Sequence, residues 1–373
     1  MNNAKIILID QTIREGMQHR GIVFSSDQRK TIARFQEKLG VDICQAGYPP
    51  AHTSEQESVR QLTEFAAKEN FSLKIAGMGR ASAKDAAVLA ETGVADFHLH
   101  AFLPPDSSEQ EKERFFSGLD ACVSTIRNEV PAARISLAML DIGRTPSGFL
   151  EKSADFLIHR VGVDILSLPD TSGIIAPNLI YDCISPVVLQ ARETATRISV
   201  HCHNDMGMAG ANTIMGVMAG ATVVEASALG IGERNGMADL FTTGKMLKDQ
   251  GFLMNLDTEA LATFKAYYDY VSDICREQTG DPLLSYNTPF FGDAVKTHVA
   301  GTHATTAFGL GQEEKFFLNT LCGKHLVKKY LEKEKIPYNK AALPAITQAI
   351  KNQSASRGRR LKRDEIRLIA TEH

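Results

Sequence analysis

Two histidines stand two residues apart in the stretch HCHND, residues 201–205. In a β-strand, side chains at positions i and i+2 point to the same face, so His201 and His203 could direct both imidazole rings at one point. A divalent metal ion uses such rings as nitrogen ligands. The spacing also suits two strand-end histidines that hydrogen-bond to neighbouring polar groups, and the short motif alone leaves both interpretations open.

Other chemically active side chains follow other apolar runs. The first run leads into IDQTIREGMQ, which contains Arg14, Glu15 and Gln18, and a later run ends in PDTSG, which contains Thr171. A carboxylate from Glu15 would add an oxygen ligand to the two imidazoles, and Arg14 would place a guanidinium beside it. The alternative for Arg14 is a surface ion pair with a neighbouring carboxylate.

The elements that must position these residues are eight short runs rich in β-branched and apolar residues, spaced roughly 25–35 residues apart. The runs are residues 5–10, 41–47, 72–78, 96–102, 134–140, 164–170, 198–204 and 223–232. Between them lie segments with helical periodicity, such as 25–40, which opens with a Ser/Asp start signal and closes with a glycine. Eight alternating units predict an α/β fold, a (β/α)8 TIM barrel, in preference to an open doubly wound sheet. The polar residues would then meet at the carboxyl ends of the strands.

This alternation stops after residue 245. We therefore expect a TIM-barrel catalytic domain over residues 1–245. Residues 246–373 are expected to form a smaller, mainly helical C-terminal subdomain.

The composition narrows the class of protein. The net charge of −3 gives no indication of a nucleic-acid or membrane-surface partner. The six cysteines include no C-x-x-C pair, which is typical of reduced thiols in a cytoplasmic protein. No apolar run approaches the ~20 residues of a membrane span, and the N-terminus does not read as a signal peptide. We expect a soluble cytoplasmic protein.

Four motifs together resemble the DRE-TIM metallolyase superfamily, and most of all its Claisen-condensing branch of isopropylmalate, homocitrate and citramalate synthases. They are IDQTIREGMQ, LPDTSG, HCHNDMGMAGAN and EASALGIGER, in the order that the superfamily has them, and the resemblance covers essentially the barrel, residues 5 to about 245. The stretch GDAVKTHVAGTH resembles the C-terminal subdomain of the branch more weakly.

The resemblance implies a TIM-barrel acyltransferase that condenses acetyl-CoA or another acyl-CoA with a 2-oxo acid to give a 2-hydroxy dicarboxylic acid, in amino-acid biosynthesis. It implies a divalent metal ion (Zn, Mn, Mg, Co or Fe) and a homodimer in which the C-terminal subdomain reaches the neighbouring barrel. The implied metal ligands are Glu15, His201 and His203, the implied catalytic residues are Arg14 and His303, and the implied substrate-binding residues are Gln18, Arg80, Arg144 and Thr171. His298 competes with His303 for the catalytic assignment.

The sequence departs from the branch at four positions. Gln45 replaces a glutamate after the second strand, and Pro104 lies where a Thr-Ser pair ends the fourth strand. Leu140 replaces the glutamate that partners the catalytic histidine, and Met237 replaces an asparagine near the metal. A metal-dependent carbon–carbon lyase or aldolase of the same superfamily is therefore the alternative function, and a barrel that lost catalysis is a third hypothesis.

Overall fold

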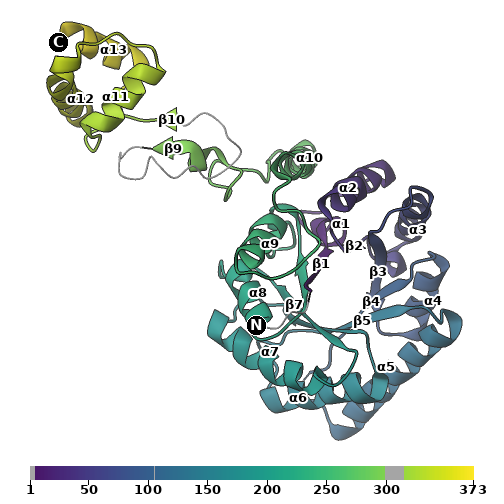
Figure 1. The fold of residues 1–373 in the computed structure, drawn as a ribbon. Helices are drawn as coiled ribbons and strands as arrows, with labels where there is room; N and C mark the ends of the chain where they lie inside the picture. The colour runs from purple at the N-terminus through teal and green to yellow at the C-terminus, as the bar shows by residue number, and fades with distance from the viewer. Residues whose placement is uncertain (1–4, 105, 299–314) are drawn as a thin grey trace. The chain divides into compact units, whose positions relative to one another are not determined.

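The computed structural model describes residues 5–104, 106–298 and 315–373. Eight strands form a closed barrel in chain order, every adjacent pair is parallel, and β8 pairs with β1 (Figure 1). The strands are β1 (Ile7–Asp10), β2 (Ile43–Gln45), β3 (Lys74–Arg80), β4 (Asp96–Ala101), β5 (Arg134–Met139), β6 (Ile165–Asp170), β7 (Arg197–Cys202) and β8 (Val223–Ala226). The prediction of a TIM barrel is confirmed.

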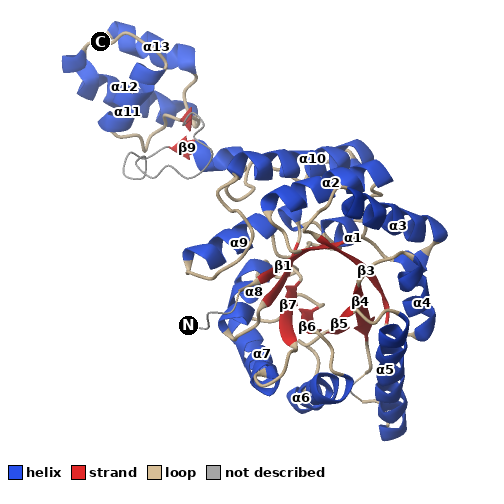
Figure 2. Cartoon of the chain, turned by 45° about the vertical axis from the view of Figure 1, so that its right-hand side comes forward, coloured by secondary structure: helices blue, strands red, loops and turns tan. Residues whose placement is uncertain are grey.

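Helices surround the barrel on its outside (Figure 2). They are α2 (Ser26–Leu39), α3 (Thr53–Lys68), α4 (Ala83–Glu91), α5 (Glu109–Glu129), α6 (Ser147–Asp155), α7 (Pro177–Ala191), α8 (Ala209–Met218), α9 (Leu240–Asp249) and α10 (Leu261–Thr279). The short, buried α1 (Thr12–Gly16) directly follows β1. The start and stop signals for α2 act as expected. Ser25 and Gln28 form a capping box at its beginning, and Gly40 ends it with a left-handed φ of 74°.

Apolar side chains fill one layer of the barrel interior. Ile9, Ile43, Ala76, Ile165 and Val223 form this buried cluster, and three of them are the first residue of their strand. The inward-facing side chains nearer the carboxyl ends of the strands include polar ones, such as Gln45, Ser167 and Glu225, all of which are buried. The apolar layer therefore fills the barrel toward the amino ends of the strands. The polar layer, nearer their carboxyl ends, forms the floor of a site.

The chain divides into two compact units, residues 1–283 and 284–373, whereas the sequence placed the boundary at 245/246. Helix α10 belongs to the first unit because it packs on α2, where the stacked rings of Phe35 and Tyr267 have centroids 5.4 Å apart. The Tyr267 hydroxyl also donates a hydrogen bond to Asp10 over 2.8 Å.

The second unit has a hydrophobic core of its own. This unit contains β9 (Thr297–His298), β10 (Lys315–Phe316), α11 (Lys324–Lys333), α12 (Leu343–Arg357) and α13 (Arg363–Glu372). Leu326, Leu331, Ile350 and Ile366 are completely buried within it. Among the described residues, no helix has the length and apolar character needed to cross a membrane.

Candidate active site

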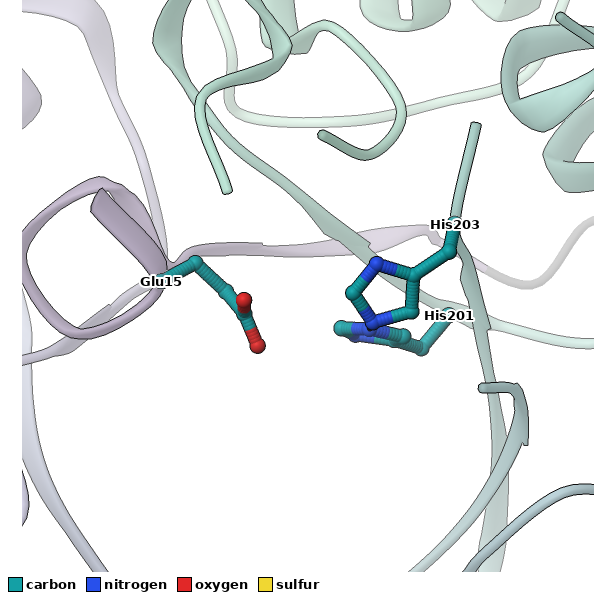
Figure 3. A group of neighbouring side chains, drawn as sticks. All are labelled: Glu15, His201 and His203. Carbon is teal, nitrogen blue, oxygen red and sulfur yellow. The ribbon is translucent and has the colours of Figure 1, made fainter. Parts of the chain in front are cut away.

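Glu15, His201 and His203 converge at the carboxyl ends of the strands. Glu15 lies on α1, directly after β1, while His201 belongs to β7 and His203 follows it. One donor atom from each lies within 4.8 Å of the others, and the two histidine Nε2 atoms are 3.2 Å apart. Figure 3 shows the carboxylate and the two rings pointing toward one another. The sequence predicted these three as the metal ligands, and the structure brings them together.

The donor atoms of this group suit a divalent cation. All three residues are at most 5% exposed, and Glu15 Oε2 is buried without a hydrogen-bond partner among the described residues. Two imidazole nitrogens that face each other and an unpartnered carboxylate oxygen are an expensive arrangement without a cation between them. A mixed nitrogen and oxygen set is a common ligand set for divalent transition metals.

Neighbouring acceptors fix the orientation of both histidine rings. His201 Nδ1 lies 3.1 Å from Glu225 Oε2, and His203 Nδ1 lies 3.3 Å from the carbonyl oxygen of Gly236. A carboxylate and a carbonyl accept hydrogen bonds, so each Nδ1 carries the hydrogen and each Nε2 keeps its lone pair free. Burial, together with the neighbouring His201, lowers the pKa of His203 to about 4, which keeps that ring neutral.

Glu225 is the functional residue that the sequence reasoning passed over. It pairs in register with His201 across β7 and β8, and it accepts hydrogen bonds from Gln11 (2.5 Å), Ser167 (2.6 Å) and Ser199 (2.8 Å) besides His201. Burial opposes its ionisation, but the bonds from His201 and the two serines outweigh burial and lower its pKa to about 2. The signal in the sequence was a lone acid in the apolar run VVEA.

Arg14 lies beside the three candidate ligands. It forms an ion pair with Glu15, and its Nε and Nη1 donate hydrogen bonds to Gln45 Oε1 (2.6 Å) and Gln18 Oε1 (3.2 Å). Its side chain is 12% exposed, so the alternative of a surface ion pair does not describe it. Burial raises the pKa of Glu15, but Arg14, together with His201 and His203, outweighs burial and lowers it.

A cavity of about 380 Å³ opens over this group. Gln18 and Thr171 line it, as the predicted substrate-binding role requires, and so do His98 and His100. Leu140 lines the cavity as well. Other lining residues are Gln45, Tyr48, Met78, Ala138 and Pro169. One part of the wall is therefore polar, and another part is apolar.

The residue after Leu140 turns away from the cavity. Strand β5 ends at Met139, and Asp141 has a left-handed φ of 64°. Its backbone N–H donates to the Thr171 hydroxyl over 3.0 Å, and its carboxylate accepts a hydrogen bond from Ser172 over 2.8 Å. Asp141 therefore does not replace the carboxylate that Leu140 removes.

Two predicted substrate-binding arginines do not line the cavity. Arg80 has a side chain 63% exposed and binds Asp85, with Nε 3.0 Å from Oδ2. Arg144 has a side chain 67% exposed and lies 3.8 Å from Asp141. Arg80 ends β3 and Arg144 lies in the turn after β5, and a neighbouring carboxylate holds each exposed side chain.

The remaining predicted positions lie elsewhere. His303 falls outside the described residues, and His298 belongs to β9 in the second unit. Pro104 is exposed beyond the end of β4. Met237 is buried, and its backbone forms an antiparallel bridge with His203, so it supports the segment after β7 that carries this candidate ligand.

Comparisons with known proteins identify the family of the chain. The family model described as HMGL-like matches residues 5–267. The chain is 30% identical to the 2-isopropylmalate synthase of Sulfurisphaera tokodaii, over 99% of this chain and 96% of that protein. It is 29% identical to a probable 2-isopropylmalate synthase of Methanosarcina acetivorans, over 100% of this chain and 72% of that protein. It is 25% identical to a homocitrate synthase of Saccharolobus islandicus, over 95% and 77%.

Solved structures show the same fold. The HMG-CoA lyase of Bacillus subtilis superposes with a TM-score of 0.63 at 18% identity, covering 77% of this chain and 98% of that one. At this identity the likeness concerns the barrel alone.

Proposed function

The chain belongs to the HMGL-like family of the DRE-TIM superfamily, and we propose that it is a metal-dependent acyltransferase of the alkylmalate synthase type. It would join the methyl or methylene carbon of acetyl-CoA or a related acyl-CoA to the ketone carbon of a 2-oxo acid. Water would then hydrolyse the resulting CoA thioester, giving a 2-hydroxy dicarboxylic acid and free CoA. The names of its relatives, 2-isopropylmalate synthase and homocitrate synthase, support a place in amino-acid biosynthesis.

The observation that carries this proposal is the convergence of Glu15, His201 and His203 beside Arg14 under one cavity. We assign the first three residues as the metal ligands. A divalent cation held by them would supply Lewis-acid polarisation of the 2-oxo acid's oxygens.

Arg14 has the geometry to stabilise negative charge on the reacting ketone oxygen. Gln45, Gln18 and Glu15 hold its guanidinium in place, so little reorganisation is needed when the alkoxide forms. Glu225 keeps the His201 ring oriented through its Nδ1–H.

Thr171 and Gln18 are proposed to bind the substrate. The Thr171 hydroxyl oxygen accepts the N–H of Asp141, so its own hydrogen is available to a substrate carboxylate in the cavity. Gln18 accepts from Arg14 with its Oε1, which leaves its amide N–H groups as donors. Leu140 and Ala138 offer apolar contact to the substrate's carbon chain.

Deprotonation of the acyl-CoA methyl group needs a base, and Leu140 removes the glutamate that partners the histidine in related enzymes. We keep His303 as the proposed base, with the resemblance to the family as its support, and we keep the cytoplasmic homodimer as the proposed assembly. Light scattering of the purified protein tests the dimer.

The experiment that tests the proposed function incubates metal-loaded protein with acetyl-CoA and a panel of 2-oxo acids. A thiol reagent follows free CoA, and the product is identified by mass spectrometry. CoA release that requires both a 2-oxo acid and Arg14 supports the synthase. A separate incubation offers a 2-hydroxyacyl-CoA or a 4-hydroxy-2-oxo acid as a cleavage substrate. Release of acetyl-CoA or of a 2-oxo acid there, with no condensation in the first assay, would favour the lyase alternative.

A further inference from the structure

One wall of the cavity contains three side chains that form a chain of hydrogen bonds. Arg14 Nε donates to Gln45 Oε1 over 2.6 Å, and Gln45 Nε2 lies 2.8 Å from His98 Nδ1. Gln45 ends β2, and His98 lies in β4. Both are buried, at 2% and 5% exposed, and both line the cavity.

The chemistry of these groups determines where the hydrogens lie. A guanidinium can only donate, so the Gln45 carbonyl oxygen must face Arg14 and its –NH2 must face His98. An amide –NH2 also only donates, so His98 Nδ1 must accept. The His98 ring is then neutral and carries its single hydrogen on Nε2.

That Nε2–H is a buried donor without a hydrogen-bond partner among the described residues. A buried donor left unpaired is unfavourable, whereas an acceptor oxygen brought to it gains a hydrogen bond. A ligand oxygen that reached His98 Nε2 would satisfy this donor, and a ligand without such an oxygen would leave it unpaired.

We propose that Gln45 is a positioning residue that holds His98 as the Nε2–H tautomer, so that the wall offers a hydrogen-bond donor to an acceptor oxygen on the side chain of the 2-oxo acid. The identity of the ligand rests on the proposed function, while the tautomer rests only on the contacts of Gln45. The proposal makes Gln45 and His98 specificity-determining residues of this cavity.

A glutamate at position 45 would reverse the arrangement. Both of its oxygens accept, so it would take hydrogen bonds from Arg14 and from a protonated Nδ1 of His98. The neutral ring would then present a lone pair at Nε2 in place of a hydrogen. Gln45→Glu changes almost no volume, so it isolates the direction of the hydrogen bond from the packing.

The first test reads the tautomer directly in the full-length protein. Histidine is labelled with ¹⁵N, and long-range ¹H–¹⁵N spectra distinguish protonated from unprotonated ring nitrogens. His98→Gln identifies the signals of this ring by their disappearance. We expect protonated Nε2 in the wild type and protonated Nδ1 in Gln45→Glu.

Gln18→Glu is the matched control. Gln18 also accepts from Arg14, over 3.2 Å, and no hydrogen bond joins its side chain to His98 in the described structure. This variant adds the same charge beside the same arginine and should leave the His98 tautomer unchanged. A protonated Nδ1 in the wild type, or the same tautomer in wild type and Gln45→Glu, would overturn the proposal.

The second test compares two 2-oxo acids of equal length, 2,5-dioxohexanoate and 5-methyl-2-oxohexanoate, which differ by a carbonyl oxygen in place of a methyl group. The wild type should favour the carbonyl acid in kcat/KM by about 5- to 10-fold, the effect of one neutral hydrogen bond, and Gln45→Glu should lose this preference. An equal preference in both proteins, or CoA release with the methyl acid alone, would refute the role of His98 toward substrate. If no 2-oxo acid in any panel releases CoA, the proposed function fails while the tautomer measurement still decides the role of Gln45.

Discussion

Glu225→Gln is the substitution that best tests how the candidate metal site is built. The side chain accepts four hydrogen bonds, from Gln11, Ser167, Ser199 and His201. Glutamine retains the shape and can place its oxygen toward Gln11 and His201, because the serine hydroxyls can rotate to accept from its –NH2. The variant therefore removes the charge and keeps the packing.

The expected loss follows from the bond to His201. A hydrogen bond to a charged group contributes about 1.5–3 kcal/mol and a neutral one about 0.5–1.5, so this bond weakens by about 1–2 kcal/mol. His201 Nε2 becomes a poorer ligand by that amount, which corresponds to a loss of metal affinity of about 5- to 30-fold.

The assay is competition for Zn²⁺ or Co²⁺ with a chromophoric chelator, with circular dichroism to verify the fold. Glu365→Gln is the matched control, because the pKa of Glu365 is also lowered to about 2, by Arg359 and other groups of the second unit. That variant should bind metal like the wild type. A folded Glu225→Gln protein with the affinity of the wild type would refute the assigned role of Glu225.

Three further predictions concern the ligands and the arginines. Arg14→Ala should lower the rate of CoA release by about 10²–10³-fold because it removes a fixed charge from the reacting oxygen, whereas Arg80→Ala should leave the rate close to that of the wild type because its side chain is 63% exposed. Zn²⁺ at a free concentration 100 times its Kd should stabilise the wild type by about 2.7 kcal/mol, which raises its Tm. The same Zn²⁺ concentration should raise the Tm of Glu15→Gln much less. Asp85→Asn should destabilise the protein by about 1 kcal/mol at pH 7, measured by urea unfolding, because hydrogen bonds and charge from Arg80 outweigh burial and lower the pKa of Asp85 below 3.8. This stabilisation is present above pH 3.8 and is lost as the pH falls through the lowered pKa of the folded state, so the difference between the two proteins should shrink there.

Contrary results would be informative in each case. A large loss of CoA release in Arg80→Ala would mean that this side chain reaches the substrate despite its exposure. An equal rise in Tm for Glu15→Gln would remove Glu15 from the ligand set. A destabilisation by Asp85→Asn that stayed constant with pH would show that its carboxylate charge plays no part.

The sequence by itself determined the barrel and the three candidate ligands. Alternating strand and helix patterns are local, and a closed barrel brings every strand's carboxyl end to one mouth. Glu15, His201 and His203 could therefore be grouped from their positions after the first strand and at the end of the seventh.

Only the tertiary structure decided which other side chains reach the cavity. Arg80 and Arg144 follow strands as Arg14 does, but Asp85 and Asp141 hold them at the surface. Glu225 became a partner of His201 through the register of β7 and β8. The hydrogen-bond direction at His98 depends on Arg14 and Gln45, which come from two other strand ends. Which side chains reach the cavity depends on the direction of each side chain and on partners distant in the chain. Local sequence patterns predict neither of these.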